Sequence, residues 1–113
     1  MTSQLYLCGR LAALPELGKT KKGKLMVRIL LETEFVRATT PGSYQSESVT
    51  LPVSFFSREA EEVRDARPGD HLVIGAHLYG TRYEAPDGNV KFGVQIIADA
   101  ILQGITHQSE AYR

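Results

Sequence analysis

The chain contains no tryptophan and only one cysteine, Cys8, among its 113 residues. A single cysteine cannot form an intrachain disulfide and cannot build a metal site from several thiolates. No apolar run approaches the length of a membrane-spanning helix, and the opening residues MTSQ lack the basic and then apolar pattern of a secretory signal. We therefore expect a cytoplasmic protein that makes no contact with a membrane.

The chain also lacks a charge excess, because 13 lysines and arginines meet 13 aspartates and glutamates. A strongly basic domain is the usual sign of a nucleic-acid partner, and that sign is absent. The charges are unevenly distributed, however: lysines crowd residues 19–24, and acidic residues crowd 59–65. Affinity for a polyanion depends on local potential, so a neutral chain can still carry a basic groove.

Residue patterns typical of enzymes are missing. His71, His77 and His107 are scattered and do not have the spacing of metal ligands. Ser54 and Ser57 lack the flanking glycines of a nucleophile elbow. We predict no catalytic residues, no metal and no cofactor.

Alternating apolar residues predict strands at Leu5–Leu11, Leu25–Phe35 and Val49–Phe56. Pro52 has no N–H to donate, which favours an edge or a bulge in the third strand. The polar segment Arg37–Ser48 contains Pro41-Gly42, and its composition predicts a mobile loop between two strands.

Ser57 has the residue type of a helix N-cap, and a short helix is predicted from there to about Arg67. The stretch Leu72–Ala98 predicts a long hairpin around Asp87-Gly88. The order is three strands, one helix and two strands, the layout of a five-stranded OB-fold, a Greek-key barrel. We therefore predict an all-β fold with one short helix and a long projecting β-hairpin, forming a domain over residues 1–103, with a short flexible tail over 104–113.

The predicted hairpin combines cations and flat rings near its tip. Arg82 and Lys91 lie beside Tyr79, Tyr83 and Phe92 in the two strands. Single-stranded nucleic acid binds to surfaces on which bases stack and phosphates meet positive charge. The rings alternatively serve as cross-strand partners that stabilise the hairpin.

Further candidates lie in the first three strands and the first loop. Arg10 and Arg28 alternate with the apolar stripes of their strands, and Phe56 points away from the stripe that contains Phe55. A loop of lysines is commonly a solvated surface, but the first loop of an OB-fold borders the ligand groove. The complete predicted nucleic-acid site is Arg10, Lys19, Lys21, Lys22, Lys24, Arg28, Phe56, Tyr79, Arg82, Tyr83, Lys91 and Phe92.

Several segments resemble the bacterial single-stranded DNA-binding proteins over about residues 4–103. They are LYLCGRLAALPEL at 5–17, VRILLET at 27–33, VSFFSREAEEV at 53–63, PGDHLVIGAHLYGTRYEAPDG at 68–88 and FGVQIIAD at 92–99. The resemblance implies an OB-fold that assembles as a homotetramer and binds single-stranded DNA in replication, recombination or repair. Family stacking positions fall near Thr50, Phe56 and Tyr83; Tyr83 replaces the usual tryptophan, and Thr50 departs from the pattern.

A second departure concerns the end of the chain. The family commonly ends in a flexible tail with an acidic tip that recruits replication and repair proteins, whereas Glu110 is the only acid in the final HQSEAYR. We therefore expect no acidic recruiting tail. The tailless relative is the primosomal replication protein N family, which is dimeric; short plasmid or phage versions of the main family are another explanation. A homotetramer is expected ahead of a dimer, and an OB-fold protein–protein adaptor or an RNA-binding module stays an alternative.

Overall fold

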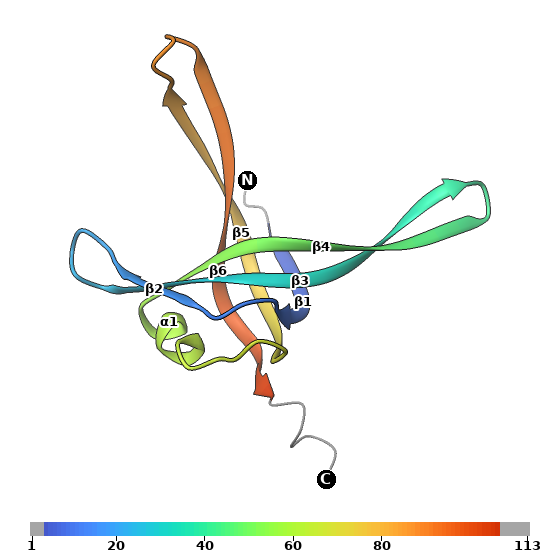
Figure 1. The fold of residues 1–113 in the computed structure, drawn as a ribbon, viewed down its shortest axis with the longest axis horizontal. Helices are drawn as coiled ribbons and strands as arrows, with labels where there is room; N and C mark the ends of the chain where they lie inside the picture. Colours follow the sequence, from blue (N-terminus) through green and yellow to red (C-terminus); the bar gives the residue numbers. More distant parts are fainter. Residues whose placement is uncertain (1–3, 107–113) are drawn as a thin grey trace.

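The structure is a computed structural model that describes residues 4–106, and it contains one barrel with two long arms (Figure 1). Its elements are β1 (Leu5–Leu11), β2 (Glu16–Lys19), β3 (Leu25–Thr40), β4 (Ser43–Phe56), α1 (Ser57–Val63), β5 (His71–Glu84) and β6 (Val90–Thr106). The strands follow the order β1-β5-β6-β4-β3-β2, and a further pairing of β1 with β3 closes the barrel. The predicted OB-fold and its projecting hairpin are confirmed.

The core lies inside the barrel and follows the alternation of the strands. Residues on one side of β3 and β4 are fully buried, whereas Arg28 on the opposite side is exposed. Helix α1 closes one end of the barrel through Ala60 and Val63. The buried set includes Leu11, Val27, Ile29, Leu31, Val53, Phe55, Leu72 and Ile74. Each such side chain contributes about 1.5–3 kcal/mol relative to exposure, so the core fixes which face of each strand remains outside.

Gly9 marks the place where β1 crosses β3 and the barrel closes. The register pairs Arg10 with Glu32 and Leu11 with Leu31. A Cβ at Gly9 would overlap the backbone carbonyl oxygen of Glu32. This close approach of two backbones therefore requires glycine.

The segment predicted as a mobile loop, Arg37–Ser48, is instead part of a long β-hairpin. Strands β3 and β4 stay paired as far as Thr40 and Ser43, and only Pro41 and Gly42 form the turn. Gly42 has φ +83°, which glycine adopts at little cost. This arm has solvent on both faces, so its strands need no apolar alternation, and the sequence pattern did not reveal them.

Strand β2 was not predicted, because Pro15 and Gly18 suggested a break in regular structure. It pairs with β3 from Glu16 to Lys19 and forms the edge of the sheet. The following turn is closed by Thr20 and Lys24: the Thr20 N–H donates to the Lys24 carbonyl at 2.8 Å, and the Lys24 N–H donates to the Thr20 hydroxyl at 3.1 Å. The lysines of this loop therefore stand on an ordered hairpin end.

Two local predictions at the helix were wrong. Helix α1 ends at Val63 rather than near Arg67, and its N-cap is Phe56, with no side-chain cap hydrogen bond. The chain passes from β4 into α1 without a spacer. Ser57 makes that turn itself with φ +55° and thus cannot occupy the extended cap conformation.

Pro52 lies in β4, and the β3–β4 ladder has no bulge at that position. It pairs with Leu30, whose carbonyl accepts a hydrogen bond from the Ala12 N–H at 2.9 Å on the other side of β3. Leu30 and Pro52 are therefore a non-hydrogen-bonded pair, and the proline nitrogen faces away from β3. β4 lies between β6 and β3 and is not the edge strand that was predicted. Because β6 pairs with β4 only at Val53 and Ser54, however, Pro52 lies on a stretch of β4 that is locally unpaired on that side.

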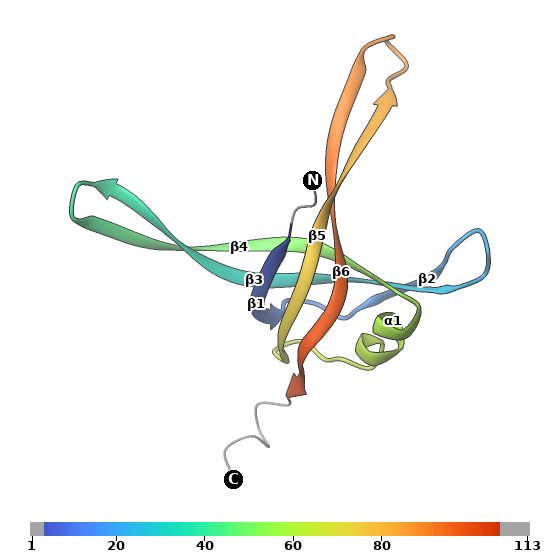
Figure 2. The same ribbon diagram turned by 180° about the vertical axis from the view of Figure 1, so that it is seen from behind.

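The two long arms leave the barrel in different directions (Figures 1 and 2). At the tip of the β5–β6 arm, the Gly88 N–H donates to the Ala85 carbonyl at 2.9 Å, and the Ala85 N–H donates to the Asn89 carbonyl at 2.8 Å. Strand β6 continues through Thr106, past the predicted domain boundary at 103. Residues 107–113 of the predicted tail lie outside the described residues.

Candidate nucleic-acid interface

The register of the β5–β6 arm assigns its side chains to two faces. Tyr79 pairs with Gln95, and Tyr83 pairs with Lys91. Partners in an antiparallel ladder point to the same side, and alternate residues of a strand share that side. These four residues therefore lie together on one face of the arm.

The same face is continuous with the outside of the barrel. Where β4 and β6 pair in parallel, buried Val53 is opposite Ile96, and Ser54 is opposite Ile97. Ser54 is also the partner of exposed Arg28 on β3. We call this side the outer face: it runs from Phe56, Arg28 and Ser54 across Ile97 to Tyr79, Gln95, Tyr83 and Lys91.

The outer face brings together five of the predicted site residues. They are Arg28, Phe56, Tyr79, Tyr83 and Lys91, drawn from four strands. Phe56 is half-buried opposite Met26, and both tyrosines are more than half exposed, at 54% and 57%. Rings that remain accessible at spaced positions, with cations beside them, can stack on bases and contact phosphates.

Two predicted residues lie on the other side of the arm. Arg82 and Phe92 are cross-strand partners, and they alternate with the tyrosine face. The sequence reasoning grouped them with Tyr83 because all three lie near the tip. Alternation along the strand places them on the side that continues the barrel interior, which we call the inner face of the arm.

The inner face of the arm is largely apolar. Leu78, Val90, Phe92 and Val94 all lie on it, and all are exposed, Phe92 by 77%. Arg82 and Glu84 supply one charge of each sign on the same face. An exposed apolar strip of this kind is more typical of a protein contact than of a path for phosphates.

The predicted arginines differ in whether their charge is available. The Arg10 guanidinium is hydrogen-bonded to the Glu32 carboxylate, with Nη2 at 2.8 Å and Nε at 3.1 Å from Oε1. That hydrogen bond and the carboxylate charge raise the pKa of Arg10. Within residues 4–106, by contrast, the Arg28 side chain has no ion pair or hydrogen bond. Arg28 is therefore a free cation on the outer face, whereas Arg10 is already neutralised.

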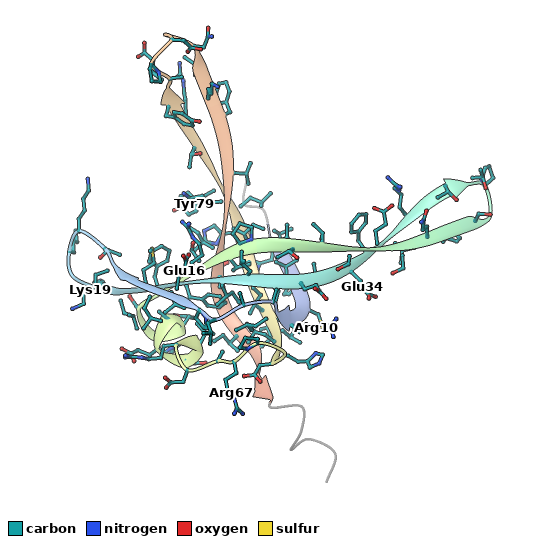
Figure 3. All side chains as sticks on the ribbon, viewed as in Figure 1. Arg10, Glu16, Lys19, Glu34, Arg67 and Tyr79 are labelled. Atoms are coloured by element: carbon teal, nitrogen blue, oxygen red, sulfur yellow. The ribbon has the colours of Figure 1, made fainter. Side chains whose placement is uncertain are left out.

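The lysine hairpin lies at one end of the barrel, on the opposite side from Arg10 (Figure 3). Lys19 ends β2, and the other predicted lysines, Lys21, Lys22 and Lys24, lie in or beside its turn. All of them are exposed. They therefore extend positive charge beyond the start of β3, where Met26 pairs with Phe56.

The foot of the β5–β6 arm is shaped by an irregularity in the ladder. Gly75 pairs with Ala100 but Ala76 with Ala98, so Asp99 is an extra residue on β6. The Asp99 carboxylate lies 2.6 Å from His77 Nδ1, and the His77 ring lies 5.0 Å from the ring of Tyr79. Bulges of this type bend a strand and redirect its side chains. The contact thus helps to position Tyr79 where the arm leaves the barrel (Figure 3).

Sequence reasoning identified only Arg28 from a group of residues that lie between the arms. Arg28, Pro52, Ser54, Leu78, Val94 and Gln95 line an open groove together with Leu51 and Ile96. Alternation alone could have put Ser54 on the face opposite Phe55, but the divergence of β4 from β6 has no signal in the sequence. Exposed Val36 on the β3–β4 arm was also missed.

In the described part of the chain, no cluster of three or more His, Cys, Asp or Glu residues is placed to hold a metal ion. None of the helices within residues 4–106 has the length and apolar character needed to span a bilayer.

The closed barrel, its single helix and its ring-bearing outer face define a member of the OB-fold class. Residues 2–103 match the model of the Single-strand binding protein family, and the chain belongs to that family. No individually curated protein is similar enough in sequence to count as a match.

Solved structures share the fold. A deletion variant of the single-stranded DNA binding protein from Thermus aquaticus is 23% identical, with a TM-score of 0.74 over 90% of this chain and 51% of the other. The wild-type protein from Thermus aquaticus is 25% identical, with a TM-score of 0.73 over 90% of this chain and 50% of the other. The Plasmodium falciparum protein in a complex with single-stranded DNA is 16% identical, with a TM-score of 0.67 over 84% of each chain. The chain thus spans about half the length of the Thermus aquaticus proteins.

Proposed function

We propose that this protein binds single-stranded DNA without catalysis and largely without regard to sequence, in replication, recombination or repair in the cytoplasm. The outer face carries the proposal, because it places Phe56, Tyr79 and Tyr83 on one continuous surface with Arg28 and Lys91. Membership of the Single-strand binding protein family supports it.

The chemistry of the outer face suits an unpaired strand better than a duplex. A base has two flat sides whatever its identity, so a row of exposed rings binds any sequence through stacking. Arg28 and Lys91 supply positive charge beside the rings, and neither has an ion-pair partner in the part of the chain that the structure describes. The lysine hairpin extends the same attraction to further phosphates.

We further propose that the protein forms a homo-oligomer, a tetramer ahead of a dimer. The inner face of the β5–β6 arm supports this, because Leu78, Val90, Phe92 and Val94 form an exposed apolar strip. Burial of such a strip against another copy would remove it from water. Light scattering of the free protein gives the mass directly, and a monomeric mass at micromolar concentration would contradict the proposal.

Binding of a fluorescent oligo-dT, followed by anisotropy at several salt concentrations, tests the proposed function. We expect saturable binding whose affinity falls steeply with salt, because neutralised phosphates release counterions. An RNA oligomer as competitor determines whether DNA is preferred. Absence of binding at low salt would refute the proposal and would leave the protein–protein adaptor, which the neutral net charge favours.

A further inference from the structure

The open groove between the two arms has a definite place in the fold. Strands β4 and β6 run in parallel and pair at Val53–Ile96 and Ser54–Ile97 only. On the side of the arms they separate, and the groove of about 420 Å³ lies where they diverge. It therefore forms a notch between the β3–β4 and β5–β6 arms, which we call the notch.

The notch has apolar walls and a polar mouth. Leu51, Pro52, Leu78, Val94 and Ile96 line it with hydrocarbon. The polar residues that line it, Arg28, Ser54 and Gln95, belong to the outer face according to the strand registers. This is the composition of small-ligand sites, where apolar walls take a ring and a few polar groups fix its orientation.

Two of the polar groups have no hydrogen-bond or ion-pair partner within residues 4–106. Ser54 is only 8% exposed as a residue, but its hydroxyl, which makes no hydrogen bond to any residue of the described chain, reaches the surface. Arg28 lies opposite Ser54 in the β3–β4 register and is likewise unpaired in that part of the chain. Glu16 is its partner on β2, but their charged atoms are not within ion-pair distance. An accessible hydroxyl and a free guanidinium therefore lie side by side in the notch, where both can donate hydrogen bonds to acceptor atoms.

We propose that the notch holds one nucleobase and selects bases whose edge presents acceptors, guanine first and thymine second. The inference rests on the proposed function, because it assumes that DNA follows the outer face. Guanine offers O6 and N7 to the fork of donors on Arg28, and thymine offers O4, whereas adenine and cytosine carry an amino donor at the position of that oxygen. An unpaired strand can turn such a base out of the stack, so that its edge enters a pocket while its faces contact the walls.

The position of the notch agrees with this role. It lies between Phe56 on β4 and Tyr79 on β5, two stacking platforms of the outer face. A strand that passes from one ring to the other crosses the mouth of the notch. One base can therefore leave the stack there and enter between Leu78 and Pro52, with its edge toward Arg28 and Ser54.

The test compares four oligo-dC strands of equal length that carry dC, dA, dT or dG at one central residue. We expect the strand with dG to bind about five-fold or more tightly than that with dA, the lower end of the discrimination by a bidentate pair, with dT between them. Arg28→Lys keeps the charge but loses the fork, so it should reduce the dG-to-dA ratio to near one; Ser54→Ala should lower the ratio in part. Lys91→Ala is the matched control: it removes a cation away from the notch and should weaken all four strands while leaving the ratio unchanged.

Each outcome has a distinct meaning. Equal affinity of all four strands for the unmodified protein would overturn the base pocket while leaving the proposed function intact. A dG-to-dA ratio that survives Arg28→Lys would overturn the role of the Arg28 fork. Failure of all four strands to bind would overturn the proposed function itself.

Discussion

Replacement of Tyr83 by alanine tests whether the outer face of the β5–β6 arm is the path of the DNA. Tyr83 is 57% exposed and pairs across the arm with Lys91. No ring contact holds it within the described residues, where only His77 and Tyr79 form such a pair. Its loss should therefore cost the arm no more than a cross-strand pair, up to about 1 kcal/mol, and the barrel should stay folded.

The effect on binding follows from the stacking of one base. A base stacked on an aromatic side chain contributes about 1–3 kcal/mol, which corresponds to a loss of about 5- to 150-fold in affinity. We expect the lower part of that range for Tyr83→Ala, because Tyr79 and Phe56 remain as platforms on the same face. Anisotropy of labelled oligo-dT measures the affinity, and circular dichroism confirms the fold.

Two companion variants separate the ring from its surroundings. Tyr83→Phe retains the flat ring and should bind within about two-fold of the unmodified protein, since stacking does not need the hydroxyl. Phe92→Ala removes a more exposed ring from the inner face of the same arm. Its direct effect on one bound strand should be much smaller than that of Tyr83→Ala. Unchanged affinity for Tyr83→Ala, or a larger loss for Phe92→Ala at equal oligomeric mass, would refute the assignment of the outer face.

Three further outcomes are expected. Gly9→Ala should lower the melting temperature by several degrees or more, because overpacking costs about 1–3 kcal/mol. Gly80→Ala should not lower it, because no atom lies near the added methyl group. Equal melting curves for the two variants would contradict the close crossing of the β1 and β3 backbones. Lys21→Ala combined with Lys22→Ala should reduce the slope of log affinity against log salt by about 1.4, at about 0.7 per phosphate contact; an unaltered slope would place the lysine hairpin outside the interface. Arg10→Ala should leave that slope unchanged, because its charge is already paired; a clear decrease would show that the ion pair opens to contact phosphate.

The sequence was sufficient for the elements that bury one face. The alternation in Leu5–Leu11 and Leu25–Phe35 exists because one side of each strand packs in the core, and both strands were found. The β3–β4 arm buries neither face, so selection for apolar residues at alternate positions is absent there, and Arg37–Ser48 read as a loop. Strand β2 depends on pairing with β3, a tertiary contact that Pro15 and Gly18 obscured.

The candidate site was predictable only in part for a related reason. Residue type identified the rings and cations, and alternation separates Tyr83 from Arg82 once the strand is known. Two features depend on the assembled sheet: the ion pair that neutralises Arg10, and the parallel contact of β4 with β6 that makes the arm's outer face continuous with Arg28. Neither distant pairing leaves a local pattern along the chain.

The notch beside Ser54 originates in main-chain geometry, because β4 and β6 diverge on the arm side of their short parallel contact. The residues at positions 28, 54 and 95 supply its polar lining and so determine its hydrogen-bonding character. Substitution of those three side chains is therefore a route to variants that keep the affinity for DNA but prefer a different base, with the backbone of the barrel unchanged.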